Sequence, residues 1–140
     1  MTARRKILAS EDVANGMVTT LLKNMPANTQ QTTLSMVVAT PKPRTIKLAI
    51  TLEGEEPVVV GGASRKARHY LVKVELGGLA GVVAPLVKKQ PPDTDVWILG
   101  GDFPVFVRSV GVLYEGGPIW TIEQTSPAWP EKSSEKSSAK

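Results

Sequence analysis

The first clear pattern along the chain is a helical one, between residues 10 and 25. Apolar side chains recur there at steps of four: Val13, Met17, Leu21 and Met25. This spacing is typical of an amphipathic helix with one buried stripe. Ser10 can cap the first turn, and Pro26 ends the run. We therefore expect one helix over 10–25 that packs on the rest of the domain through the first three residues of this stripe.

After Pro26 the pattern changes to an alternation of apolar and polar residues, which indicates half-buried strands. The alternation is clearest over three segments: 34–38, 45–52 and 69–76. Glycine and proline signals predict turns at five places: 41–43, 53–55, 61–62, 100–101 and 116–118. We expect a mainly β (α+β) domain. Its form is a curved antiparallel sheet or open half-barrel of about seven strands, with the amphipathic helix packed on it.

The last third of the chain is apolar on both faces of its expected strands. The segments concerned are 96–99, 103–107 and 119–122. Strands of this kind are covered on both sides. One side would take the core of the sheet, and the other would take the helix, a partner or an apolar ligand. The glycine-rich residues 77–87 lack the charges of an exposed strand, and we expect a short helix or an irregular crossover there.

The composition limits the classes of protein that the chain can belong to. It has 140 residues, of which 41% are hydrophobic and 21% are charged, and this suits one folded domain. It has no cysteine and one histidine, which excludes a disulfide framework, a thiol nucleophile and a site of several histidines. No apolar run reaches the length of roughly 18 residues that a membrane span needs, so we expect a soluble domain.

The positive charge of the chain lies at its two ends. The net charge is +4, but without residues 1–6 and 131–140 the basic and acidic residues are equal in number. We divide the chain into three parts: a basic arm at 1–9, a single globular domain at 10–130 and a disordered tail at 131–140 that holds two EKSS repeats. The basic cluster of Arg65, Lys66 and Arg68 is expected on a solvated turn, so we expect no nucleic-acid partner.

Four motifs in the second half of the chain carry a resemblance. They are GLAGVVAPLVKKQPPD at 78–93, VWILGG at 96–101, GGPIW at 116–120 and TSPAWP at 125–130. They resemble the C-terminal region of an uncharacterised family of exported bacterial proteins. The order of helix, hairpins and last strands is also similar, more distantly, to the half-barrels of lipoprotein carriers. In those proteins a curved antiparallel sheet holds an acyl chain under a helical lid.

The resemblance implies a fold and an export route, with no catalytic residue. It points to a periplasmic or secreted parent protein. The opening MTARRKIL lacks the apolar segment of a signal peptide and favours the cytoplasm for the chain as given, so the compartment stays open.

Few residues offer catalytic or metal-binding chemistry. Histidine is the usual general base near neutral pH, and His69 is a weak catalytic candidate together with Asp102. Asp93 and Asp95 lie two residues apart after two prolines, a spacing that can share a hard cation such as calcium. Turn and capping roles explain the aspartates more simply, and a structural or surface role explains the histidine.

Aromatic residues concentrate in the last third of the chain. Trp97, Phe106 and Trp120 would line a pocket for an apolar ligand, with Arg108 at its rim to hold a carboxylate or a lactone carbonyl. Alternation predicts that Phe106 and Arg108 share a face of their strand. Packing in the core is an alternative role for the same aromatic residues, and the sequence does not decide between the two.

Two functions from different classes remain. The favoured one is a non-catalytic module without a cofactor, which binds an apolar or acyl small molecule or a partner protein. Self-association is left open. The alternative is a small metal-dependent hydrolase that acts on an ester or lactone, such as an acyl-homoserine lactone. His69 would then be the base, and calcium or zinc would polarise the carbonyl.

Overall fold

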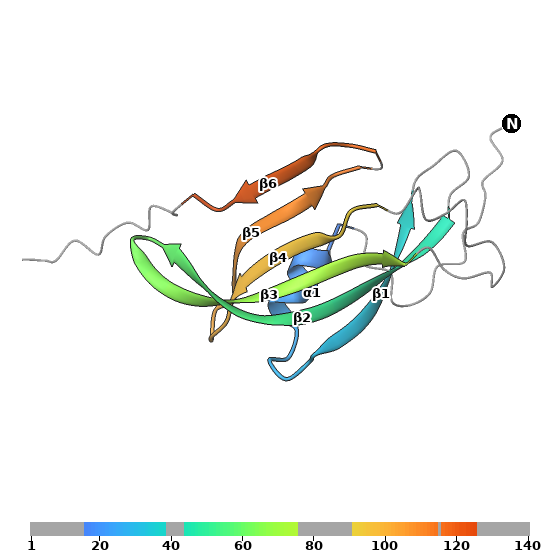
Figure 1. Ribbon diagram of the computed structural model, residues 1–140. Helices are drawn as coiled ribbons and strands as arrows, with labels where there is room; N and C mark the ends of the chain where they lie inside the picture. The colour runs from blue at the N-terminus through green and yellow to red at the C-terminus, as the bar shows by residue number, and fades with distance from the viewer. Residues whose placement is uncertain (1–15, 39–43, 76–90, 115, 126–140) are drawn as a thin grey trace, which may run out of the picture.

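The computed structural model describes residues 16–38, 44–75, 91–114 and 116–125, and these form one open antiparallel sheet with a single short helix (Figure 1). The helix α1 spans Val18–Asn24. The expected helix over 10–25 was wrong at Gly16 and Met17, which form a turn in which Gly16 has a φ of 70°. The strands are β1 Gln31–Val38, β2 Arg44–Val60, β3 Ala63–Glu75, β4 Thr94–Leu99, β5 Val105–Val112 and β6 Ile119–Glu123. Each strand pairs with the next one along the chain. The predicted mainly β class, with an unclosed antiparallel sheet and one helix, is confirmed.

Several sequence-based expectations lie outside the described residues. They concern the basic arm, the first residues of the helix, the turn at 41–43, the crossover at 77–87 and the tail. Within the described residues no helix has the length and apolar character needed to cross a membrane.

The longest element is the hairpin of β2 and β3, which projects beyond the other strands in Figure 1. Its turn is made by Gly61 and Gly62, with φ of 59° and 77°. A two-residue hairpin turn with positive φ at both central positions favours glycine. The turn expected at 53–55 was wrong, because β2 continues through these residues. The register there shifts between Leu52 and Gly54, so the glycine marks a β-bulge.

The helix α1 lies against one face of the sheet, which we call the helix face (Figure 1). The core on this face combines seven buried residues: Leu22, Leu48, Ile50, Tyr70, Val72, Val96 and Ile98. Burial of these side chains is the main favourable contribution to the fold. Val18 and Met25 pack on the same cluster as Leu22, so the buried stripe of α1 runs through these three residues.

The expected helix stripe was therefore wrong by one position. Met17 is 51% exposed, and Leu21 is exposed as well, while Val13 lies outside the described residues. The sequence carries two adjacent apolar stripes at helical spacing, one through Met17 and Leu21 and one through Val18 and Leu22. Either could be buried by the pattern alone. In the structure the stripe through Val18 and Leu22 is the buried one.

The opposite side of the sheet, the outer face, carries a smaller cluster. Ala67, Trp97 and Leu99 are buried in it, and five valines pack against them: Val58, Val60, Val105, Val107 and Val110. As a result β4 is covered on both faces, as its apolar sequence predicts. The expectation of two covered faces was wrong for β6, whose five residues are all exposed because it forms an edge of the sheet.

Candidate functional site

Polar and aromatic side chains form a row across four strands of the outer face. His69 of β3 lies opposite Trp97 of β4, and Trp97 lies opposite Arg108 of β5. The imidazole and indole rings stack at 4.5 Å between centroids with 7° between their planes. The Arg108 Cζ atom lies 4.0 Å from the Trp97 ring centroid, a cation–π contact. Arg108 Nη1 also lies 3.7 Å from Oε1 of Glu123 on β6.

Both ring nitrogens of His69 contact carboxylates. Nδ1 lies 2.9 Å from Oε1 of Glu56, and Nε2 lies 2.6 Å from Oδ1 of Asp95. A neutral imidazole can donate from one nitrogen only, whereas an imidazolium donates from both. The His69 ring thus bridges the Glu56 and Asp95 carboxylates through its two nitrogens.

Glu56 connects the histidine to the tryptophan. The Trp97 Nε1–H donates a hydrogen bond of 2.7 Å to Glu56 Oε2, while Oε1 faces His69. The Trp97 hydrogen bond lowers the pKa of Glu56 below 4.5. Desolvation opposes this shift in part, and the His69 contact and the charge of Arg108 add to it. The bulge at Gly54 places Glu56 on the outer face, because it reverses the alternation of β2 beyond this point.

The catalytic and metal candidates are only partly brought together. His69 and Asp95 are in contact, but Asp102 lies exposed in the bend after β4, and Asp93 is exposed just before β4. With each nitrogen facing a carboxylate, His69 would have to break one contact before accepting a proton from a substrate. Among the described residues, no three acidic or histidine side chains form a group that could hold a metal ion.

The four residues expected to line an apolar pocket lie in separate places. Trp97 and Arg108 are stacked on the outer face, while Phe106 packs with the core of the helix face. Trp120 is half exposed on β6. The expectation that Phe106 shares a face with Arg108 was wrong, because a register shift between Trp97 and Ile98 places Phe106 opposite Ile98.

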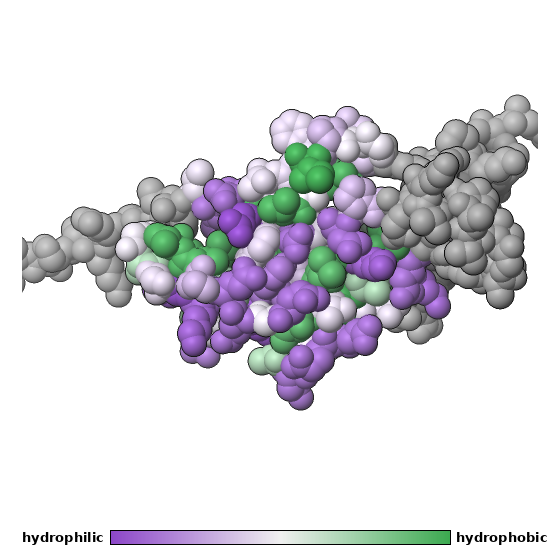
Figure 2. Space-filling view, viewed as in Figure 1, coloured by the Kyte–Doolittle hydropathy of each residue, from purple (hydrophilic) through white to green (hydrophobic). Residues whose placement is uncertain are grey.

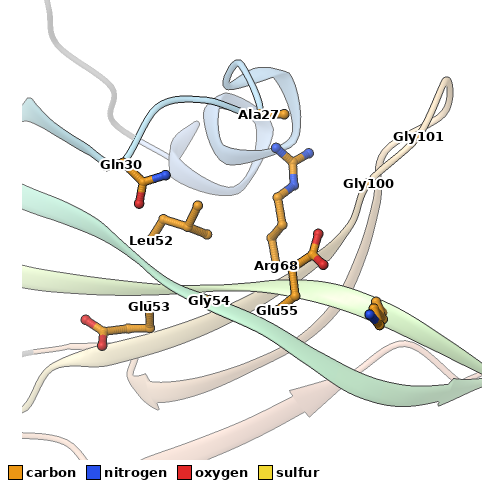
Figure 3. Close-up of a pocket in the computed structure, with 10 residues that line it drawn as sticks. Ala27, Gln30, Leu52, Glu53, Gly54, Glu55, Arg68, Gly100 and Gly101 are labelled. Atoms are coloured by element: carbon orange, nitrogen blue, oxygen red, sulfur yellow. The ribbon is translucent and has the colours of Figure 1, made fainter.

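An open cleft of about 570 Å³ lies on the helix face instead (Figure 3). Its lining comes from the connection between α1 and β1, from β2 and β3 around the Gly54 bulge, and from the turn after β4. The residues are Ala27, Gln30, Leu52, Glu53, Gly54, Glu55, Lys66, Arg68, Gly100 and Gly101. The cleft is thus lined by both polar and apolar groups, and it lies at the end of the core of the helix face.

Arg68 is the most unusual residue of this cleft. It is 8% exposed and is the one buried charged side chain among the described residues. Its Nη1 donates a long hydrogen bond of 3.5 Å to the Met25 carbonyl oxygen, and its Cζ lies 6.0 Å from the Tyr70 ring centroid. It forms no ion pair with any described aspartate or glutamate. A buried guanidinium thus lacks the anionic partner that such groups normally have.

A buried hydroxyl group lies beside Arg68. The Tyr70 hydroxyl is buried without a hydrogen-bond partner in the described part of the chain. Burial raises the pKa of Tyr70, and the nearby charge of Arg68 opposes the shift. The Tyr70 hydroxyl is thus the unsatisfied polar group at this end of the core, and Arg108 Nε on the outer face is likewise buried without a hydrogen-bond partner among the described residues.

The sequence-based view of Arg68 as part of a solvated basic turn was wrong. Arg65 and Lys66 are exposed as expected, but Arg68 is not. A signal was present, because Arg68 precedes the buried Tyr70 and Val72 at steps of two and so shares their face.

A scan against protein-family models, a search of curated proteins and a search of solved structures found no match to the chain.

Proposed function

We propose that this protein is a non-catalytic binding module that holds a small carboxylate ligand with an apolar portion in the cleft around Arg68. The observation that carries the proposal is the buried guanidinium, which lines an open cleft and has no counter-ion in the described residues. The proposal specifies the acyl-ligand function expected from the sequence and moves its anchor from Arg108 to Arg68.

The cost of burying the Arg68 charge supports an anionic ligand. Burying a charge is costly unless an opposite charge and hydrogen bonds compensate it. A carboxylate can accept two parallel N–H bonds from a guanidinium, which is the strongest neutralisation available to arginine. In Figure 3 the guanidinium is directed towards Ala27, while the Glu53 carboxylate points to the opposite side. The donor end of Arg68 is therefore turned away from Glu53, whereas the Glu55 carboxylate points to the same side as the Arg68 side chain without forming an ion pair with it.

The rest of the cleft restricts the ligand. Ala27 and Leu52 provide apolar contact, and the Gln30 amide can both donate and accept hydrogen bonds. Glu53 and Glu55 at the lining disfavour a ligand with several negative charges. A single carboxylate on a short acyl or N-acyl group fits these conditions better than a phosphate or a dicarboxylate.

The hydrolase alternative finds less support in the geometry. A general base needs a nitrogen that faces the reactant, whereas both nitrogens of His69 face carboxylates of its own chain. His69 also lies on the outer face, across the sheet from the cleft that Arg68 lines.

Isothermal titration calorimetry with matched ligands tests the proposal. We expect octanoate and N-octanoylglycine to bind with a saturable signal, and the neutral octanamide to bind at least tenfold more weakly. Arg68→Met should abolish the preference for the carboxylate. Arg65→Met, which removes an exposed arginine of the same strand, should not change it. Equal binding of octanoate and octanamide, or full binding by Arg68→Met, would contradict the proposal.

A further inference from the structure

Strand β6 is an edge of the sheet that exposes large apolar side chains. Ile119, Trp120 and Ile122 are 62%, 50% and 42% exposed, and β6 pairs only with β5 among the described strands. Figure 2 shows apolar side chains, in green, over this upper part of the molecule. Natural edge strands usually carry charges, prolines or bulges that prevent pairing with another chain. Within β6 the single charged residue is Glu123, at its last position.

The direction of the free backbone groups follows from one hydrogen bond. The Gln124 N–H donates to the Val107 carbonyl oxygen on β5. Backbone groups of successive residues in a strand point alternately to the two neighbouring strands. Trp120 and Ile122 therefore share the direction of Gln124 and face β5. The N–H and C=O groups of Ile119, Thr121 and Glu123 point to the open edge.

We propose that a second copy of this chain pairs with β6 in antiparallel fashion, with the two Thr121 residues opposite each other on a two-fold axis. Every outward N–H and C=O group of β6 then finds a partner, because Ile119 of each copy lies opposite Glu123 of the other. The two sheets join into one continuous sheet with α1 on the same face in both copies.

The side chains of β6 are self-complementary in this register. Trp120 of each copy lies opposite Ile122 of the other, which gives two apolar cross-strand pairs on the helix face. No two carboxylates face each other, because Glu123 lies opposite Ile119. Glu123 also keeps Arg108 of its own chain as counter-ion. This complementarity of one sequence with itself favours a second copy over an unrelated partner.

The oligomeric state in solution tests the pairing. We expect sedimentation velocity to show a concentration-dependent monomer–dimer equilibrium. Trp120→Glu should raise the dimer Kd at least tenfold by placing a carboxylate against the apolar pair. Thr121→Pro should do the same by removing an outward N–H group, which an edge strand tolerates without loss of its own pairing. Phe103→Glu changes a more exposed aromatic residue, in the bend before β5, and should leave the Kd unchanged.

Cross-linking tests the register. The chain has no cysteine, so a single introduced thiol reports on one contact. Residues opposite each other in a hydrogen-bonded antiparallel pair have Cα atoms about 5.5 Å apart, a distance that a disulfide spans. Thr121→Cys should form a disulfide-linked dimer under mild oxidation. Ile119→Cys and Gln31→Cys, the latter on the opposite edge strand β1, should not.

Three results would overturn the proposal. They are a protein that remains monomeric at millimolar concentration, a dimer that persists in both Trp120→Glu and Thr121→Pro, and a dimer in which Thr121→Cys does not cross-link. Circular dichroism melting of each variant separates loss of pairing from loss of folding. Octanoate binding at Arg68 is independent of these outcomes.

Discussion

His69 and Trp97 lie directly opposite each other on β3 and β4, with their rings stacked 4.5 Å apart and nearly parallel. Arg108 covers the other side of the indole at 4.0 Å. The indole N–H is also used, because Glu56 accepts its hydrogen bond. One tryptophan thus joins side chains of four strands on the face that lacks a helix, where the apolar cluster is small. We infer that this row stabilises the outer face and positions its strands.

The Trp97 hydrogen bond should contribute measurably to stability. Trp97→Phe keeps an aromatic ring opposite His69 but removes the donor to Glu56. We expect the free energy of unfolding in urea to fall by about 1–3 kcal/mol, from the lost hydrogen bond and the smaller ring. The exposed Phe103→Leu should change it by less than about 0.5 kcal/mol. A double-mutant cycle with Glu56→Ala, which removes the acceptor, isolates the pairwise term, and a coupling energy of zero would contradict the role of the bond.

Acid sensitivity should depend on Glu56. Its pKa is lower in the folded state than the ordinary 4.5, so the unfolded chain binds this proton more readily. The stabilisation is fully present above the unfolded-state pKa and is lost as the pH falls through the lower folded-state pKa. We expect Glu56→Gln to lose less stability than the wild type between roughly pH 5 and pH 3. Glu75→Gln, at an exposed position of β3, is the control. Parallel pH profiles for wild type and Glu56→Gln would refute the prediction.

Replacing Arg68 should not destabilise the ligand-free protein. Arg68→Met removes a buried charge that has no counter-ion in the described residues and keeps an apolar chain of similar length. We expect the melting temperature to stay equal or to rise, as when buried ionic groups are replaced by apolar ones. Differential scanning calorimetry of Arg68→Met against Arg65→Met measures this. A loss of several degrees in Arg68→Met alone would show that the guanidinium is satisfied within the chain.

The helix should depend on Leu22 and not on Met17. Leu22 is fully buried in the core of the helix face, whereas Met17 is half exposed. We expect Leu22→Ala to lower the free energy of unfolding by about 2–5 kcal/mol and Met17→Ala by less than about 0.5 kcal/mol. Chemical denaturation followed by circular dichroism compares the two. Similar losses of stability in both variants would show that the buried residues of α1 have been assigned wrongly.

Gly111 should resist substitution because of a close approach between strands. A Cβ atom there would overlap the side chain of Thr94, which lies against it on β4. We expect Gly111→Ala to destabilise the protein by about 1–3 kcal/mol, and Thr94→Gly to restore part of the loss in the double variant. At Gly100 the nearest atom would be a side-chain nitrogen of Arg68 at 3.5 Å, an ordinary contact. Gly100→Ala is therefore the control, and equal effects at both glycines would contradict the argument.

The sequence could predict that Arg68 is buried, but it could not predict that Arg68 has no carboxylate partner in the described part of the chain. Arg68 stands in step with Tyr70 and Val72, so alternation places it on the buried face. The sequence does not say whether a buried arginine has a carboxylate partner. Glu55 lies directly opposite Arg68 in the register and still forms no ion pair with it. Only side-chain positions in three dimensions show a guanidinium left without a counter-ion.

The sequence by itself determined the mainly β class, the β2–β3 turn at Gly61–Gly62 and the end of a helix before Pro26, because these depend on local backbone preferences. The tertiary structure alone decided which side chains meet. At Gly54 and at Trp97–Ile98, a shift of one residue reverses which side chains face the helix. Glu56 thereby reaches Trp97, and Phe106 leaves the face of Arg108. The apolar pattern of β6 likewise could not show an edge, because exposure depends on whether another strand lies beside it.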